Sequence, residues 1–295
     1  MNGAKISVII PIYNHADYVI ECLSSVVNQQ DENLEIVAID DGSVDNSYEL
    51  ASKYLIEEAN EIQWKLSTRE NRGINKTLNE AIKNSSGEII YVLASDDRMP
   101  VGSLMAMRER YLQEIDGCKL FFYDVSLINW QGNVICENAT CSRQGGAYLL
   151  GYSKMHLAAQ IILNWGHPFT HQFYCRTFYD KYGPYPEDLK YEDLYFALKA
   201  ISADRFVFTF QVLKEYRLRQ VQSQTPGLTQ LDLNQEFIRR ISKRSIKKRY
   251  SMLLTIGHLA FGDCDKPKAF IFRALGFLLR NCVYLIAYIR SRAIR

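Results

Sequence analysis

Two pairs of adjacent aspartates have the residue types and the positions that chemistry would need. Asp40-Asp41 and Asp96-Asp97 each follow a short apolar run that is typical of a buried strand. In a parallel sheet, ligands bind where the carboxyl ends of the strands meet, so we expect the two pairs to lie at one site. Carboxylates gathered there repel one another unless a cation joins them. Mg²⁺ or Mn²⁺ carrying a diphosphate is the natural partner, although each aspartate alone is also explained as a helix cap or turn residue.

The glycine-rich phosphate loops of two large classes of nucleotide-binding protein are missing. Neither GxGxxG nor GxxxxGK[ST] occurs in the sequence. Their absence argues against a dinucleotide enzyme and against a P-loop NTPase. The composition, with 47% hydrophobic and 23% charged residues, is that of an ordinary globular protein and excludes wholesale disorder.

The elements that must position the aspartates alternate between strand and helix over the first hundred residues. Apolar runs predict strands at 6–11, 35–40, 64–67 and 88–94. Apolar residues at helical spacing predict helices at 17–29, 46–59 and 74–83. This alternation implies right-handed βαβ units and a parallel sheet. Farther along, the sequence predicts a strand at 120–125 and a helix that begins at Glu192-Asp193.

Five segments resemble, in order and in separation, the inverting family-2 glycosyltransferases of the GT-A fold. They are Ile6–Asn14 (ISVIIPIYN), Ser25–Gln29 (SVVNQ), Ala38–Ser43 (AIDDGS), Asn71–Gly73 (NRG) with Asn79, and Leu93–Asp97 (LASDD). The resemblance is close over about the first 105 residues and continues more loosely through 191–193 and 216–217.

The resemblance implies an α/β fold of the GT-A type. This fold has a Rossmann-like nucleotide-binding sheet with helices on both faces and a merged acceptor subdomain. We therefore divide the chain into a nucleotide-sugar-binding half at 1–105, an acceptor-binding half at 106–225, and basic amphipathic C-terminal helices at 226–295.

The resemblance also implies a donor site. The residues that would line the nucleoside pocket or approach the diphosphate are Pro11, Tyr13, Asn14, Asp40, Asp41, Asn71 and Arg72. Asp41 would accept the N3–H of uracil, a proton that cytosine lacks. Ser95-Asp96-Asp97 matches the DxD-like acidic motif, in which Asp97 would ligate Mn²⁺ or Mg²⁺ and Asp96 would hold the ribose or a metal-bound water. A surface position is the alternative for Arg72.

For catalysis, the resemblance implies that Asp193 is the general base that takes the proton of the acceptor hydroxyl. Glu192 lies about 100° away around the predicted helix, so we expect it to contact the acceptor or a neighbouring loop instead. Simple capping by acids in a first helical turn is the alternative for both. Candidates for contact with the diphosphate or the acceptor are His171, Arg217 and Arg219, and a purely structural histidine is the alternative for His171. Arg219 stands where many family members have a His, and an arginine cannot ligate a metal.

The C-terminal part carries a second signal. From Phe237 to the end there are 14 Lys or Arg residues and two Asp or Glu residues. A stretch of 21 largely apolar residues at 269–289 is interrupted by Arg273, Arg280 and Asn281. We expect an in-plane amphipathic helix on an anionic membrane surface, bound through 237–295; a membrane span or re-entrant hairpin and a buried bundle helix are the alternatives. The basic run contains few aromatic residues and no nucleic-acid-binding motif, so we expect no nucleic-acid partner.

The strand predicted to begin at Ile6 leaves no room for a signal peptide, and the seven cysteines show no zinc or disulfide spacing. We therefore expect a peripheral protein on the cytoplasmic face of the inner (plasma) membrane. The expected activity is metal-assisted, inverting transfer of a hexosyl or N-acetylhexosaminyl group from a UDP-sugar to a lipid-linked saccharide, as in O-antigen or capsule assembly. The alternatives are the same fold with a dTDP-sugar donor, and a non-catalytic protein that binds nucleotide sugars or acts as a membrane scaffold.

Overall fold

The computed structural model describes residues 3–114, 119–139, 154, 158, 171–188 and 193–218. Three of the sequence predictions lie outside these residues: the C-terminal helices at 226–295, Glu192 and Arg219. Within the described part, no helix has both the length and the apolar character needed to cross a membrane.

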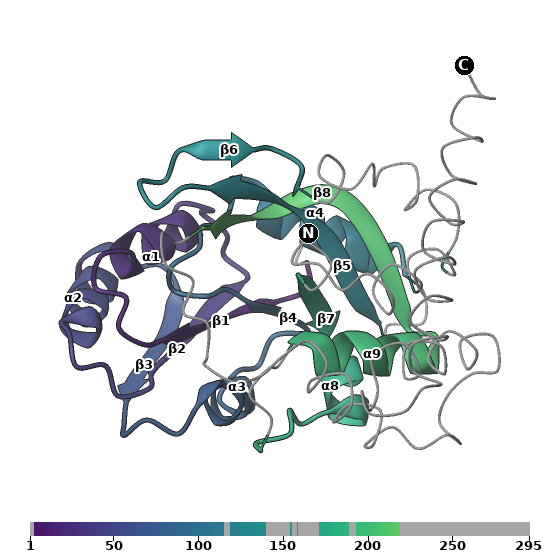
Figure 1. Ribbon diagram of the computed structural model, residues 1–295, viewed down its shortest axis with the longest axis horizontal. Coiled ribbons are helices and arrows are strands. Elements are labelled where there is room, and N and C mark those ends of the chain that lie inside the picture. The colour runs from purple at the N-terminus through teal and green to yellow at the C-terminus, as the bar shows by residue number, and fades with distance from the viewer. Residues whose placement is uncertain are drawn as a thin grey trace, which may run out of the picture.

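The described residues form a mixed α/β structure around an eight-stranded sheet (Figure 1). Its strands are β1 (Ile6–Ile12), β2 (Leu34–Asp40), β3 (Gln63–Thr68), β4 (Ile89–Val92), β5 (Leu120–Ile128), β6 (Val134–Cys136), β7 (Gln172–Cys175) and β8 (Phe206–Arg217). Their order is β3-β2-β1-β4-β7-β5-β6, and β8 pairs with β5. Strands β1 to β4 are parallel to one another, whereas β7 is antiparallel to both β4 and β5.

The parallel half follows the predicted alternation. Both β1 and β2 are buried along nearly their whole length, which explains why they appear in the sequence as continuous apolar runs. The intervening helices are α1 (Val19–Val27), α2 (Ser47–Glu58) and α3 (Ile74–Lys83). Helices α1 and α2 pack against each other, while α3 packs on β1 and β2 from the opposite face (Figure 1). The predicted helix at 74–83 has the observed bounds, and the other predicted elements of this half agree to within a few residues at their ends.

The second half adds α4 (Ser103–Leu112), α8 (Arg176–Tyr182) and α9 (Asp193–Ala203). Its strands do not form a separate sheet, because β7 lies between β4 and β5 and so joins both halves. A further link is made by Arg98 and Glu215, which form an isolated antiparallel bridge between the segment after β4 and strand β8.

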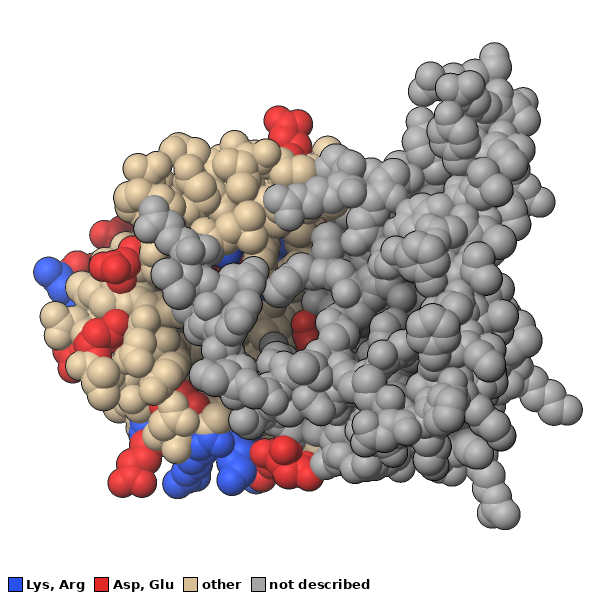
Figure 2. Space-filling model, in the orientation of Figure 1, with Lys and Arg blue, Asp and Glu red and all other residues tan. Residues whose placement is uncertain are grey.

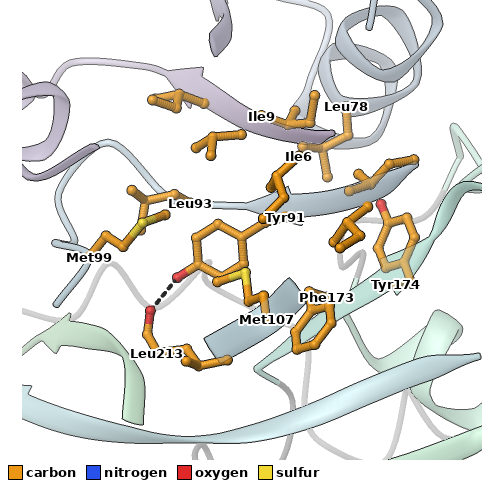
Figure 3. Close-up of a cluster of buried hydrophobic side chains, with 14 of the residues drawn as sticks. Ile6, Ile9, Leu78, Tyr91, Leu93, Met99, Met107, Phe173, Tyr174 and Leu213 are labelled. Carbon is orange, nitrogen blue, oxygen red and sulfur yellow. Dashed lines mark hydrogen bonds between the residues drawn. The ribbon is translucent and has the colours of Figure 1, made fainter. Parts of the chain in front are cut away.

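The core fills the space between these strands with aliphatic and aromatic side chains. Figure 3 shows Tyr91 of β4 reaching across this core, where its hydroxyl donates a hydrogen bond of 2.8 Å to the carbonyl of Leu213 on β8. Phe173 of β7 stacks on Phe121 of β5, with ring centroids 4.5 Å apart. The bond from Tyr91 fixes β8 against the parallel half, and the aromatic stack fixes β7 against β5. Strand β8 contributes residues to the site.

A buried carboxylate fastens the amino end of the sheet. Glu35 accepts hydrogen bonds from the hydroxyl of Ser7 and from the backbone N–H groups of Ser86 and Gly87, and its carboxylate lies 3.2 Å from the Nζ of Lys5. Burial alone would raise the pKa of Glu35, but the hydrogen bonds from Ser7, Ser86 and Lys5 outweigh it and lower the pKa from 4.5 to about 2. The ionised form is therefore the one that stabilises the fold.

Glu35→Gln is accordingly expected to lower the free energy of unfolding by about 3 kcal/mol at pH 7. Since the folded-state pKa is the lower one, this contribution is complete above about pH 4.5 and is lost as the pH falls toward 2. Urea unfolding of both proteins at pH 7 and near pH 3 measures it, with Glu32→Gln as a control at an exposed acid nearby. An unchanged difference between wild type and Glu35→Gln at the two pH values would contradict this account.

Candidate active site

Asp41, the second acid after β2, holds the loop that follows β3. Its buried carboxylate accepts backbone N–H groups from Arg72 and Gly73, each at 2.9 Å, and it forms an ion pair with Arg69. Gly42 allows this close approach, because its φ is +76° and an added Cβ would lie 2.7 Å from the backbone nitrogen of Asn71. Three of the roughly four acceptor positions of the carboxylate are thus filled, which leaves one for a ligand.

Asp40, the first acid of this pair, is also buried, but it stabilises the turn itself. Its carboxylate accepts the hydroxyl of Thr68 at 2.8 Å, together with the backbone N–H and the hydroxyl of Ser43. The hydroxyl of Ser43 in turn accepts the N–H of Asn14, and the side-chain oxygen of Asn14 accepts the N–H of Val44. These bonds tie the end of β1 to the end of β2.

The remaining residues predicted for the nucleoside pocket lie at the same edge of the sheet. Pro11 is part of β1, where it pairs in register with Ile39, and Tyr13 follows that strand with 47% of its surface exposed. Asn71 and Arg72 are exposed on the loop that Asp41 holds. Sequence reasoning missed Arg69, although Thr68 pairs with Asp40, so a residue directly after β3 necessarily falls beside Asp41.

The acidic motif after β4 is held from β8. The Oδ1 of Asp97 accepts the backbone N–H of Arg217 at 2.9 Å, and its Oδ2 lies 3.5 Å from the Nζ of Lys214. Burial raises the pKa of Asp97 to about 7, and the charge of Lys214 opposes this rise. Burial alone would lower the pKa of Lys214, but the neighbouring Tyr123 and Asp97 raise it above its usual value. Lys214 was not among the predicted site residues.

Asp96 has a different environment. Its carboxylate lies 3.8 Å from the Nδ1 of His15, and the same nitrogen lies 2.7 Å from the hydroxyl of Ser95. Its carbonyl accepts the Nε–H of Arg217 at 2.7 Å. The loop between β1 and α1 is thus brought against the acidic motif.

Arg217, a predicted contact of the diphosphate or acceptor, is buried beneath the motif, with its side chain 1% exposed. Besides Asp96, its guanidinium donates to the carbonyl of Trp130 and to the carboxylate of Glu21, and it lies 4.7 Å from the ring centre of Tyr18. These contacts favour a positioning role over direct contact with a ligand. Sequence reasoning did not anticipate that Glu21 would join Arg217 to Arg98.

Asp193 begins α9, as predicted, and its carbonyl accepts the side-chain amide of Gln172 at 3.2 Å. Burial raises the pKa of Tyr216, and together with the negative charges of Asp97, Asp96 and Asp193 it brings this pKa to about 12. Tyr216 directly precedes Arg217, whose N–H binds Asp97, and its ring lies 5.2 Å from that of His171, the neighbour of Gln172.

His171, another predicted candidate, is buried directly before β7. Its ring packs between those of Tyr123 and Tyr216, with ring centroids 6.0 and 5.2 Å away. His171 therefore lies beside Tyr216 and directly precedes Gln172, which binds the carbonyl of Asp193.

The described residues do not by themselves assemble a site for Mn²⁺ or Mg²⁺. Among them, no group of three or more His, Cys, Asp or Glu residues has an arrangement that could hold a metal ion. Each oxygen of Asp97 already has a protein partner, one of which is a cation. The cation beside Asp97 in this structure is the ammonium of Lys214.

Comparisons with known proteins agree with this architecture. The profile of Glycosyl transferase family 2 matches residues 7–158. Over 93 residues the chain is 37% identical to the glycosyltransferase GlyG of Streptococcus pneumoniae serotype 4, a match that covers 31% of this chain and only 30% of GlyG. Over 256 residues it is 27% identical to an uncharacterized glycosyltransferase of Rickettsia typhi, covering 82% of this chain and 74% of that protein.

A solved structure shows the same fold. The crystal structure of S. aureus TarS 1-349 in complex with UDP-GlcNAc matches with a TM-score of 0.66 and 22% identity, over 88% of this chain and 74% of that one. The fold is therefore GT-A-like. Since the family profile spans more than half of the 295 residues, the chain belongs to glycosyl transferase family 2.

Proposed function

We propose that this chain transfers a sugar from a UDP-sugar to a hydroxyl group of a saccharide acceptor, with inversion at the anomeric carbon. The observation that carries this proposal is a short chain of contacts that joins Asp97, after β4, to Asp193, at the start of α9. The N–H of Arg217 binds Asp97, the ring of the adjacent Tyr216 packs on His171, and the next residue, Gln172, binds the carbonyl of Asp193. Inverting displacement needs a site that holds the leaving diphosphate on one face of the sugar and a base that acts at the opposite face.

Each group then has a defined task. The acceptor oxygen attacks the anomeric carbon while the bond from that carbon to the diphosphate oxygen breaks, so that UDP leaves with the bonding electrons. Asp193 accepts the proton of the attacking hydroxyl. Arg72, exposed on the loop held by Asp41, is positioned to offset the charge of the leaving diphosphate.

The uridine nucleotide is proposed from the chemistry of Asp41. Its remaining acceptor position suits the N3–H of uracil, and the solved TarS structure that shares the fold contains UDP-GlcNAc. Thymine presents the same N3–H, so a dTDP-sugar is the second candidate donor. The transferred group is a hexosyl or N-acetylhexosaminyl group.

Mn²⁺ or Mg²⁺ at Asp97 stays a prediction of the family resemblance. Because the described residues do not complete a metal site, the proposed reaction contains no step through a metal.

The acceptor is proposed to be a lipid-linked saccharide of a bacterial surface polysaccharide, with the chain peripheral on the cytoplasmic face of the membrane. Support comes from the basic segment 237–295. On the described part of the face in Figure 2, acidic and basic side chains lie interspersed, so this face offers no broad basic patch of its own. Flotation of the full chain with anionic vesicles tests the location, and failure to float at low salt would contradict it.

The donor is tested by calorimetric binding of UDP, dTDP, CDP and GDP to the full chain in detergent. We expect UDP to bind about tenfold or more tightly than CDP, because the N3 of cytosine has no proton to donate to Asp41 and would bring a lone pair against its carboxylate. Release of nucleoside diphosphate from UDP-glucose, UDP-N-acetylglucosamine and dTDP-rhamnose then identifies the donor. Absence of binding to every nucleotide would overturn the proposal and favour a scaffold protein.

A further inference from the structure

Lys214 places a positive charge inside the acidic motif, where the family resemblance expects a metal. It lies on β8 with 9% of its side chain exposed, and its Nζ is 3.5 Å from the Oδ2 of Asp97. We propose that Lys214 is the resident cation of this motif, so that the chain binds its nucleoside diphosphate without the help of a divalent metal. This inference rests on the proposed donor site and concerns how that site is neutralised.

Both carboxylate oxygens of Asp97 are already engaged within the protein. Its Oδ1 accepts the N–H of Arg217 and its Oδ2 faces the ammonium of Lys214. A metal ion at Oδ2 would be placed against an ammonium group of the same sign, and like charges at such separations repel strongly in a buried site. A divalent ion would therefore have to displace Lys214 from a position in which it is almost wholly enclosed.

The charges around the acidic motif are nearly balanced by side chains of the protein itself. Lys214 pairs with Asp97, Arg98 pairs with Glu21 and Glu215, and Arg217 also pairs with Glu21. The carboxylate of Asp96, the fourth acid, lies 3.8 Å from the Nδ1 of His15. Three cations supplied by the protein thus stand against four carboxylates. The repulsion that would otherwise require a metal is largely removed within the chain.

Lys214 is held in place by its neighbours on both sides along β8. Tyr91, whose hydroxyl binds the carbonyl of the adjacent Leu213, fixes this part of β8 against β4 (Figure 3). On the other side of Lys214, Glu215 pairs with Arg98 through both backbone and side chain. Lys214 is therefore a fixed part of the site and not a mobile surface side chain.

The test measures binding of UDP to the full chain by calorimetry, once in EDTA and once in excess Mn²⁺. For wild type and for Lys214→Arg, which keeps the charge, we expect the two affinities to agree within about threefold. For Lys214→Met we expect UDP binding in EDTA to weaken by about tenfold or more, with Mn²⁺ restoring most of it. Lys53→Met, at an exposed position of α2, is the matched control and should behave as wild type.

Binding of Mn²⁺ alone, followed by its electron paramagnetic resonance signal, separates this inference from the proposed function. We expect wild type not to bind Mn²⁺ tightly and Lys214→Met to gain a Mn²⁺ site. That site should be absent from the double variant that carries both Lys214→Met and Asp97→Asn. The inference would be overturned if wild type bound UDP tenfold more tightly with Mn²⁺ than in EDTA, or if wild type bound Mn²⁺ through Asp97. Both outcomes are measured on wild type, so they do not depend on whether Lys214→Met folds. If UDP failed to bind in both buffers, the donor site would be wrong, and the Mn²⁺ signal would still decide the role of Lys214.

Discussion

Replacing Asp193 with Asn is expected to lower the rate of sugar transfer by about 10²- to 10⁴-fold, the usual contribution of a positioned general base. Asn is nearly the same size as Asp but cannot accept the proton of the attacking hydroxyl. The measurement is UDP release from the identified UDP-sugar, with polyprenyl-diphosphate-linked saccharides as acceptors. The affinity for UDP should remain near that of wild type. Asp193 lies at the start of α9, away from Asp41 and from the loop that Asp41 holds.

The competing explanation of Asp193 is stabilisation of a helix N-terminus. An acid in the first turn typically contributes 0.3–1 kcal/mol, so under that explanation Asp193→Asn would cost about this much stability and leave transfer intact. Asp180→Asn, at an exposed position of α8, controls for the loss of one acidic charge on a neighbouring helix. Transfer at the wild-type rate with a slightly lower melting temperature would remove Asp193 from the proposed mechanism.

The sequence was most informative where local pattern and tertiary environment agree. Helix α3 was predicted with its observed bounds because its apolar spacing is regular and the Ser-Ser-Gly sequence at 85–87 ends it. The strands β1 and β2 were recognisable because burial on both faces requires continuous apolar runs.

The antiparallel part of the sheet was not predictable in the same way. Strand β7 has only four residues, and its partners β4 and β5 precede it by long stretches of chain. Strand β8 ends with Lys214, Glu215 and Arg217, three charged residues that suggest a surface segment. They are tolerated there because Asp97, Arg98 and Glu21 supply their opposite charges, and no local pattern contains that information.

The site residues also divide into those that a local pattern reveals and those that depend on which strands pair. The acids after β2 and β4 were found because parallel strands bring their carboxyl ends together. The basic residues that complete the site, Lys214 and Arg69, depend on which strands become neighbours. Arg217 was identified from the family resemblance as a possible ligand contact, but only the packing of β8 shows that its guanidinium faces the protein interior.

That burial leads to the second large effect. Arg217→Met is expected to lower the free energy of unfolding by about 3–5 kcal/mol, the usual consequence of removing one partner from a buried ionic network. The carboxylate of Glu21 would lose a cation, the carbonyls of Asp96 and Trp130 would lose their donors, and the contact with the ring of Tyr18 would disappear. Arg217→Lys should recover only part of this loss, because an ammonium cannot reproduce the planar fork of donors.

Urea unfolding of the full chain measures the effect, and Arg72→Met provides a contrasting control. Arg72 is exposed on the loop held by Asp41, so its replacement should leave the free energy of unfolding within about 0.5 kcal/mol of wild type and weaken UDP binding instead. Arg217→Met should show the reverse pattern, provided that UDP binding is measured on folded protein at low temperature. If Arg217→Met unfolded like wild type and lost UDP affinity, Arg217 would be a direct contact of the diphosphate. The backbone hydrogen bond from residue 217 to Asp97, the Lys214–Asp97 pair and the Arg98–Glu215 bridge would then suffice to hold the acidic motif against β8.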